Sequence, residues 1–122
     1  MAVQSYRELI AWQKSVDLVE EIYRITKCFP KEETYGLTSQ MRRAAVSVPS
    51  NIAEGQGRSS RGEFCQFLGH AKGSLFELET QVVISARLGY LSSQEANGLL
   101  ESIHEVGRIL SGLLASLVNT NN

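Results

Sequence analysis

Apolar residues recur with helical spacing in four segments of this chain. In the last two segments they alternate in steps of three and four residues, which places them on one side of a helix. Each of these segments also follows a serine that has a glutamate three residues later, the spacing of a capping box. The stripe positions are Phe64, Leu68, Ala71, Leu75, Leu78, Val82 and Ser85 in the third segment, and Ala96, Leu99, Ile103, Val106, Leu110, Leu113 and Leu117 in the fourth.

The first two segments have similar patterns, and proline or glycine marks their ends. Phe29-Pro30 ends the first helix, because the residue before proline is disfavoured in the α region. Gly55 and Gly57 end the second, because glycine readily takes the left-handed capping conformation. The first segment has two adjacent stripes, Leu9, Trp12, Val16, Val19, Tyr23 and Thr26 beside Leu18, Ile22, Ile25 and Phe29, and the second has one, Leu37, Met41, Ala44, Ala45, Val48 and Ile52.

Four long helices with short connections predict one all-α domain over residues 1–122, an up-down-up-down antiparallel four-helix bundle. The helices carry more apolar surface than a monomeric bundle hides, since such a bundle buries one face of each helix. The third helix adds Phe67, Phe76, Val83 and Ile84 beside its stripe. This excess predicts a homo-oligomer with the extra apolar residues at subunit contacts. The predicted helices span about 5–28, 37–55, 61–88 and 93–118.

Composition and charge fit a soluble globular protein whose positive charge is concentrated locally. Apolar residues make up 43% of the chain, and the net charge is −1. Residues 34–62 contain four arginines and one acid, so they carry +3 while the remainder carries −4. Cys28 and Cys65 are too few for a disulfide framework, and no apolar run reaches the length of a signal peptide or a membrane span. We therefore expect a cytoplasmic protein with reduced thiols and no membrane contact.

Pro49 lies inside the second helix and has two interpretations. It lacks an N–H, so the carbonyl of Ala45 loses its helical donor and the helix should bend. The bend either fits the bundle or shapes a pocket. Arg42 lies on the same flank among small apolar residues, an arrangement typical of a protein contact. We expect Arg42 or its more exposed neighbour Arg43 to pair with a glutamate of the third helix, within the subunit or across an interface. The candidate partners are Glu77 and Glu79.

Polar residues form a stripe on each of the two middle helices. If the stripes face each other they make a hydrogen-bonded seam that fixes the register of the bundle. An enzyme would instead use Glu54, Glu77 and His70 as an acid–base set, but the sequence has no recognisable nucleophile or oxyanion site to go with them. The seam is therefore the favoured interpretation. The stripes are Gln40, Ser47, Asn51 and Glu54 on the second helix, and His70, Ser74, Glu77 and Gln81 on the third.

The loop EGQGRSSRGE between the two middle helices is the main candidate for binding an anion or a nucleic acid. Arg58 and Arg61 lie beside the N-terminus of the third helix, where backbone N–H groups favour anions. The alternative is an ordinary solvated capping loop. The loop lacks the Gly-Lys-Ser/Thr of a phosphate-binding loop. Arg43 is a further candidate cation for this contact.

No metal or cofactor site is expected from the sequence. Glu101 and His104 have the Glu-x-x-His spacing of di-iron bundles, but those sites require a second such pair, and the chain has none. Cys28 and Cys65 lack metal-ligand spacing as well.

Several linked motifs resemble one known family across about residues 5–118. They are YRELIAWQKSVDLVEEIYRITKCFP, YGLTSQMRRAAVSVPSNIAEGQGR, GSLFELETQ and LGYL. The chain resembles the four-helix bundle proteins of the ribosomal-protein-S23-like family, which are encoded in intervening sequences of bacterial 23S ribosomal RNA genes. The shared motif includes Arg42, Arg43, Asn51, Glu54, Gly55, Gly57 and Arg58.

The resemblance implies a ring-shaped homopentamer with no known enzymatic activity. Accessory proteins of diversity-generating retroelements look like relatives and bind nucleic acid, but they are basic, whereas this chain is slightly acidic. Two hypotheses follow. In the first, a non-enzymatic oligomer binds RNA or a ribonucleoprotein through its basic loop. In the second, the oligomer is a scaffold or protein-interaction module without nucleic-acid binding, and its arginines form intersubunit pairs with Glu54, Glu77 or Glu79.

Overall fold

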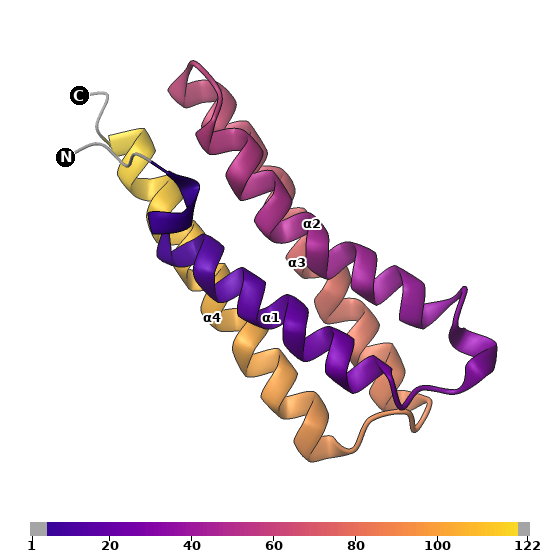
Figure 1. Cartoon of the computed structure of the whole chain (residues 1–122). Coiled ribbons are helices and arrows are strands. Elements are labelled where there is room, and N and C mark those ends of the chain that lie inside the picture. Colours follow the sequence, from indigo (N-terminus) through magenta and orange to yellow (C-terminus); the bar gives the residue numbers. More distant parts are fainter. Residues whose placement is uncertain (1–4, 120–122) are drawn as a thin grey trace.

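The computed structural model describes residues 5–119, and it holds four α-helices and no strand in that range (Figure 1). This confirms the predicted all-α class. The ends of the predicted domain, residues 1–4 and 120–122, lie outside the described range. The helices are α1 Ile10–Thr26, α2 Leu37–Gln56, α3 Arg61–Arg87 and α4 Ser93–Asn119, with short 3₁₀-helices η1 at Tyr6–Glu8 and η2 at Lys31–Glu33.

The first helix is shorter than the sequence pattern predicted. Ser5 Oγ accepts a hydrogen bond from the Arg7 N–H at 3.1 Å and caps η1 instead of starting a long helix. Leu9 is then extended, with φ −76° and ψ 126°, so α1 begins only at Ile10. The bounds of α2, α3 and α4 agree with the predicted ranges to within one residue at each end.

Gly55 and Gly57, at the C-terminal end of α2, do not have the left-handed conformation that the sequence predicted. Gly57 has φ −79°, so it does not use the left-handed conformation, and Gly55 lies inside the helix and is buried. A Cβ added to Gly55 would lie 2.6 Å from the Cβ of Phe67 in α3. Gly55 is therefore required for the close approach of α2 to α3. Among the described residues the left-handed glycine is Gly89, with φ 83°, just after α3.

The helices form two side-by-side pairs around one core. In Figure 1, α1 lies beside α4 and α2 lies beside α3, and the α2–α3 connection is at the opposite end from the other two connections. Contacts join α1 to α2, α2 to α3, α3 to α4 and α1 to α4, which closes the core. The predicted stripes of α3 and α4 are all buried or half-buried. The largest fully buried side chains are Leu18, Ile22, Met41, Ile52, Leu68, Leu78, Leu99, Ile103, Leu110, Val48, Val82 and Val106.

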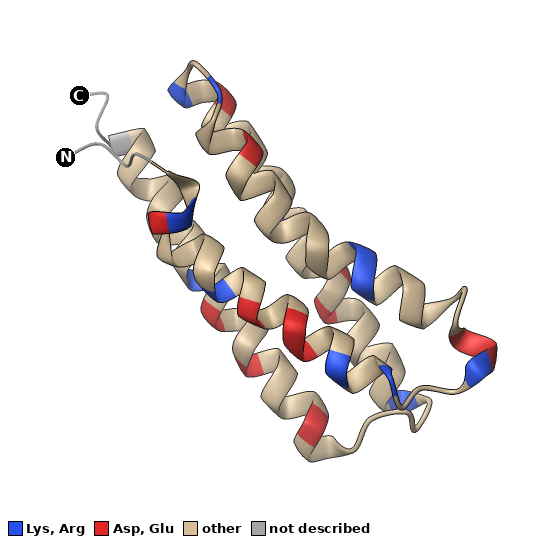
Figure 2. Ribbon diagram, in the orientation of Figure 1, with Lys and Arg blue, Asp and Glu red and all other residues tan. Residues whose placement is uncertain are grey.

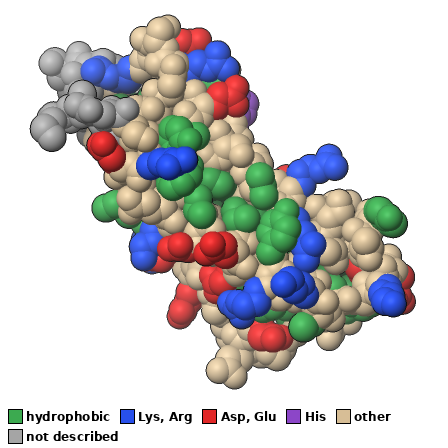
Figure 3. All heavy atoms as spheres, in the orientation of Figure 1, with side chains coloured by type: hydrophobic (Ala, Val, Ile, Leu, Met, Phe, Trp, Pro, Cys, Tyr) green, Lys and Arg blue, Asp and Glu red, His purple; other side chains and the backbone are tan. Residues whose placement is uncertain are grey.

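Of the two stripes on α1, the second is the core face. Leu18, Ile22 and Phe29 are buried, whereas Trp12 is half-buried and Tyr23 is 39% exposed. Figure 3 shows hydrophobic side chains along the line between α1 and α2 on the visible face. The first stripe, which contains Trp12 and Tyr23, therefore covers the flank of the α1–α2 contact.

Pro49 lies in the interior and not on a surface that a second subunit could contact. It is buried within α2, and the helix continues past it to Gln56. The amide of Asn51 donates to Ser47 O at 2.8 Å and to Ser47 Oγ at 3.0 Å. The Asn51 amide therefore donates to Ser47. It does not replace the N–H that Pro49 lacks, which would have bonded to the Ala45 carbonyl.

Candidate functional site

The polar stripes of α2 and α3 meet at one point. Ser74 Oγ lies 2.9 Å from Ser47 Oγ, and Asn51 completes this small network from α2. Gln81 is buried and donates to Glu77 on its own helix at 3.4 Å, while its Oε1 has no partner among the described residues. In the part of the chain that the structure describes, the polar contact between the two stripes is thus limited to a serine pair with its amide neighbour.

The three residues of the acid–base hypothesis are not brought together. Glu54 accepts from Arg58, Glu77 accepts from Gln81, and the His70 ring packs against Phe67 with centroids 5.9 Å apart. All three side chains are exposed. The space between α2 and α3 is filled by fully buried side chains, among them Met41, Val48, Ile52, Leu68 and Leu78.

Carboxylates accompany the basic groups of the α2–α3 loop. Arg58 Nη2 lies 2.9 Å from Glu54 Oε2, and its guanidinium carbon lies 4.7 Å from the ring centroid of Phe67. Ser60 Oγ accepts from the Glu63 N–H at 3.1 Å and donates to the Glu63 carboxylate at 3.2 Å. The carboxylate of Glu63 therefore lies at the N-terminus of α3, where an anion would bind. Arg61 is exposed at the first position of the helix.

Arg42 contacts α1, and among the described residues of the single chain it makes no ion pair with a glutamate of α3. Its Nε donates to Thr26 Oγ1 at 2.9 Å, its Nη2 donates to Tyr23 O at 3.3 Å, and its guanidinium lies 4.5 Å from the centroid of the Tyr23 ring. Glu79 instead bonds His104 of α4 at 3.1 Å. Arg43 is exposed and makes no ion pair with another described residue.

A groove of about 450 Å³, not predicted from the sequence, lies between the end of α1 and the first half of α2; we call it the α1–α2 groove. It combines two guanidinium groups with hydroxyls and two tyrosines, and none of the described residues that line it carries a carboxylate. The signal was present in the sequence as TYGLTSQMRR, but only the fold brings Tyr23 to it. The lining residues are Tyr23, Thr34, Tyr35, Thr38, Ser39, Arg42, Arg43 and Val46.

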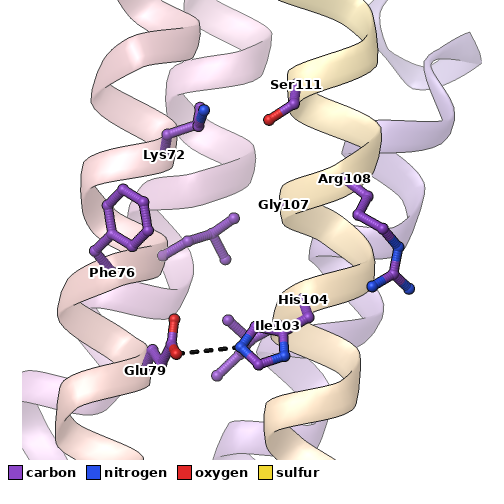
Figure 4. A pocket seen from close by; sticks show the side chains of 9 residues that line it. Lys72, Phe76, Glu79, Ile103, His104, Gly107, Arg108 and Ser111 are labelled. Atoms are coloured by element: carbon purple, nitrogen blue, oxygen red, sulfur yellow. Dashed lines mark hydrogen bonds and ion pairs between the residues drawn. The ribbon is translucent and has the colours of Figure 1, made fainter.

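A second groove of about 450 Å³ lies on the surface between α3 and α4. Figure 4 shows Lys72 and Phe76 on α3 facing Ser111 and His104 on α4, with the Glu79–His104 bond crossing the groove at one end. Leu75, Ile103 and Gly107 also line it. Phe76 is 63% exposed, so this apolar ring is largely open to water.

Glu33 and Tyr90 join the α1–α2 connection to the end of α3. Glu33 Oε1 accepts from the Leu37 N–H at 3.0 Å and caps α2, while Glu33 Oε2 accepts from the Tyr90 hydroxyl at 3.0 Å. The hydrogen bond to Glu33 raises the pKa of Tyr90 above its ordinary value, and partial burial and the charges of Glu33 and Glu32 raise it further. The Tyr90 ring also packs on Phe29, with centroids 5.5 Å apart.

Within residues 5–119 there is no cluster of three or more His, Cys, Asp or Glu that could hold a metal ion. His104 of the Glu101–His104 pair is bonded to Glu79. Cys28 is exposed, Cys65 is half-buried, and both are free thiols. The described helices include none that is long and apolar enough to cross a membrane.

The fold and these surfaces define an all-α protein of four helices with a local concentration of basic groups. The family model for the 23S rRNA-intervening sequence protein matches residues 7–112, and the chain belongs to this family. Its fold is similar to the crystal structure of a protein of unknown function from the S23 ribosomal protein family of Bacteroides thetaiotaomicron. The TM-score is 0.81 at 20% identity, over 87% of this chain and 96% of that chain. The search of curated proteins found no match.

Proposed function

We propose that this chain is a non-enzymatic, up-down-up-down four-helix bundle protein that assembles as a ring-like homopentamer and binds RNA or a ribonucleoprotein. The observation that carries the RNA contact is the charge of residues 34–62, which is +3 in a chain of net charge −1. Its arginines lie on α2 and just beyond its C-terminal end, with Arg43 and Arg61 exposed. The family is described by an intervening sequence of 23S rRNA, and this association with ribosomal RNA also supports RNA binding.

Apolar side chains left exposed on α3 support the assembly. Phe76, Val83 and Ile84 are 63%, 38% and 42% exposed in the single chain. Exposed apolar groups clustered on one helix are typical of a protein contact. The number five comes from the resemblance to the family. Five copies of a weak basic surface around a ring would bind one polyanion with avidity.

The test is fluorescence anisotropy with a structured ribosomal RNA fragment at several salt concentrations. We expect the logarithm of the affinity to fall with the logarithm of salt, with a slope of about −0.7 to −0.9 for each phosphate contact. An Arg58→Glu/Arg61→Glu variant of equal oligomeric mass should bind more weakly if the α2–α3 loop takes part. Wild-type protein that shows no binding even at low salt would contradict the RNA function.

One observation favours the alternative function, an oligomeric scaffold or protein-interaction module without nucleic-acid binding. Arg58 is already occupied by Glu54 and by stacking on Phe67, although this pair lies within one chain and that hypothesis expects pairs between subunits. The pair is an exposed i, i+4 contact, however, and such pairs stabilise a protein by only about 0 to 1 kcal/mol. The salt titration above separates the two functions. A cytoplasmic location belongs to the proposal, with the free thiols Cys28 and Cys65 in its support.

A further inference from the structure

We propose that the α1–α2 groove is where this chain holds single-stranded RNA, with an unpaired base on Tyr35 and the adjoining phosphate on Arg42 and Arg43. The inference rests on the proposed RNA binding and deepens it by naming the surface and the form of RNA. It also moves the main contact away from the α2–α3 loop.

The described residues that line the groove carry positive charge and no negative charge. Its eight lining residues include two arginines, three Ser or Thr hydroxyls and two tyrosines, and no carboxylate. At the α2–α3 loop, in contrast, Arg58 is bound to Glu54, and the Glu63 carboxylate lies at the start of α3. An incoming phosphate would meet repulsion at the loop and only donors in the groove.

The chain segment that forms the groove carries a net positive charge. Residues 23–46 contain five Lys or Arg and two glutamates, so they carry +3, and the rest of the chain carries −4. One of the two glutamates, Glu33, is already used by the Leu37 N–H and the Tyr90 hydroxyl. In Figure 2, basic residues lie at the end of α1, in the connection and in the first half of α2, and the connection holds acidic residues too; Figure 3 shows basic side chains at this end of the molecule with acidic ones among them.

Arg42 is held in place for such a contact. Two of its five N–H donors bond to Thr26 and to the Tyr23 carbonyl, and the guanidinium stacks on the Tyr23 ring. Three donors remain for a ligand. Because the side chain is already ordered, binding a phosphate costs little additional conformational entropy.

Tyr35 supplies the feature that selects unpaired RNA. Its side chain is 95% exposed and lines the same groove as Arg42 and Arg43. A tyrosine so exposed buries almost nothing within the chain, so packing does not explain it. Aromatic rings beside a basic track are how proteins stack the bases of single strands, whereas bases in a duplex are already stacked on each other.

The experiment compares a short fluorescein-labelled oligouridylate with an abasic ribose-phosphate strand of equal length, using the full chain. Tyr35→Ala should lower oligouridylate affinity about fivefold or more, because stacking contributes roughly 1–3 kcal/mol per base, and should leave abasic-strand affinity unchanged. Tyr35→Phe should bind like the wild type. Arg43→Ala should weaken binding of both strands and reduce the salt slope by about 0.7.

An Arg58→Ala/Arg61→Ala variant is the matched control, and it should keep most of the oligouridylate affinity. If wild-type protein binds the ribosomal RNA fragment in a salt-dependent way but the Tyr35 and Arg43 variants bind as well as it does, the groove proposal is overturned and the RNA function stands. If no RNA binds, both are overturned. A changed oligomeric mass of Tyr35→Ala in light scattering would make the groove a subunit or protein contact and would also overturn the proposal.

Discussion

At the scale of single residues, two glycines two positions apart should respond in opposite ways to the same substitution. Gly55→Ala would place a Cβ 2.6 Å from Phe67 Cβ and 3.1 Å from Phe64 Cδ1, so α2 and α3 must move apart. We expect the free energy of unfolding to fall by about 1–3 kcal/mol, the usual cost of overpacking. Urea unfolding followed by circular dichroism measures this difference.

Gly57→Ala is the control. Gly57 has φ −79° and ψ −4°, a conformation open to alanine, and an added Cβ would meet only Glu54 O and Ala53 O at 3.6 and 3.7 Å. We expect no loss of stability and a gain of up to about 1 kcal/mol, because alanine restricts the unfolded chain more than glycine does. Equal destabilisation by both substitutions would contradict a specific close approach at Gly55.

At the scale of the elements, the link between η2 and the end of α3 predicts a dependence of stability on alkaline pH. The folded state holds the Tyr90 proton more tightly than the unfolded chain, because the hydroxyl donates to Glu33 and ionisation would place two negative charges together. This contribution is complete below the ordinary tyrosine pKa of about 10. It is lost as pH rises through the raised pKa of the folded state.

Tyr90→Phe removes this dependence while keeping the ring against Phe29. Above pH 10, wild-type protein should therefore lose stability more steeply than the variant, as measured by urea unfolding at a series of pH values. The ultraviolet absorbance of the phenolate should show one tyrosine that ionises later than the others, and that signal should be missing in Tyr90→Phe. Parallel stability curves for the two proteins would show that the Glu33 bond does not form in solution.

The elements were readable from sequence because each helix repeats its signal over many turns. The capping box predicted at the start of α4 is present. The Glu95 N–H donates to Ser92 Oγ at 3.0 Å, and the Ser92 N–H donates to Glu95 Oε1 at 2.9 Å. The contacts between elements were not readable. Periodicity places Arg42 on a flank of its helix but does not say which helix that flank meets, and the partner proved to be α1.

The candidate site was harder to predict than the fold for the same reason. The sequence pointed to Arg58, Arg61 and Arg43 because cations stand out along the chain. Glu54 and Glu63 belong to the loop sequence itself, four residues before Arg58 and three after Ser60, so their local contacts could be read from the sequence. The sequence did not show that Tyr23 stands beside Arg42 across the α1–α2 contact, because that contact depends on side-chain packing between segments that only the fold brings together.

At the scale of the whole molecule, basic and apolar surfaces belong to different elements. The basic α1–α2 groove contains Arg42 and Arg43, whereas the exposed apolar residues Phe76, Val83 and Ile84 lie on α3. An assembly in which α3 packs on a surface of the next subunit other than the groove would therefore leave the groove open in every subunit. RNA binding and oligomer formation should accordingly be separable by mutation.

Phe76→Asp tests this separation. Phe76 is 63% exposed and beside the α3–α4 groove, so the change should leave the helices intact but place a charge in an apolar subunit contact. We expect the mass in light scattering to fall toward the 13.5 kDa of one chain with unchanged far-ultraviolet circular dichroism. Gln66→Asp, which adds the same charge at an exposed polar position of α3, should keep the wild-type mass.

The RNA affinity of the dissociated variant then shows whether RNA binding and subunit assembly use one shared surface or two separate surfaces. If each subunit has its own groove, dissociated Phe76→Asp protein should still bind a short oligouridylate that one groove can accommodate, because no contact in that groove has changed. It should bind a long RNA much more weakly, since the avidity of linked sites is lost. A variant that stays fully assembled would show that Phe76 is outside the subunit contact. A dissociated variant that no longer binds even the short strand would show that the RNA site is completed by a neighbouring subunit.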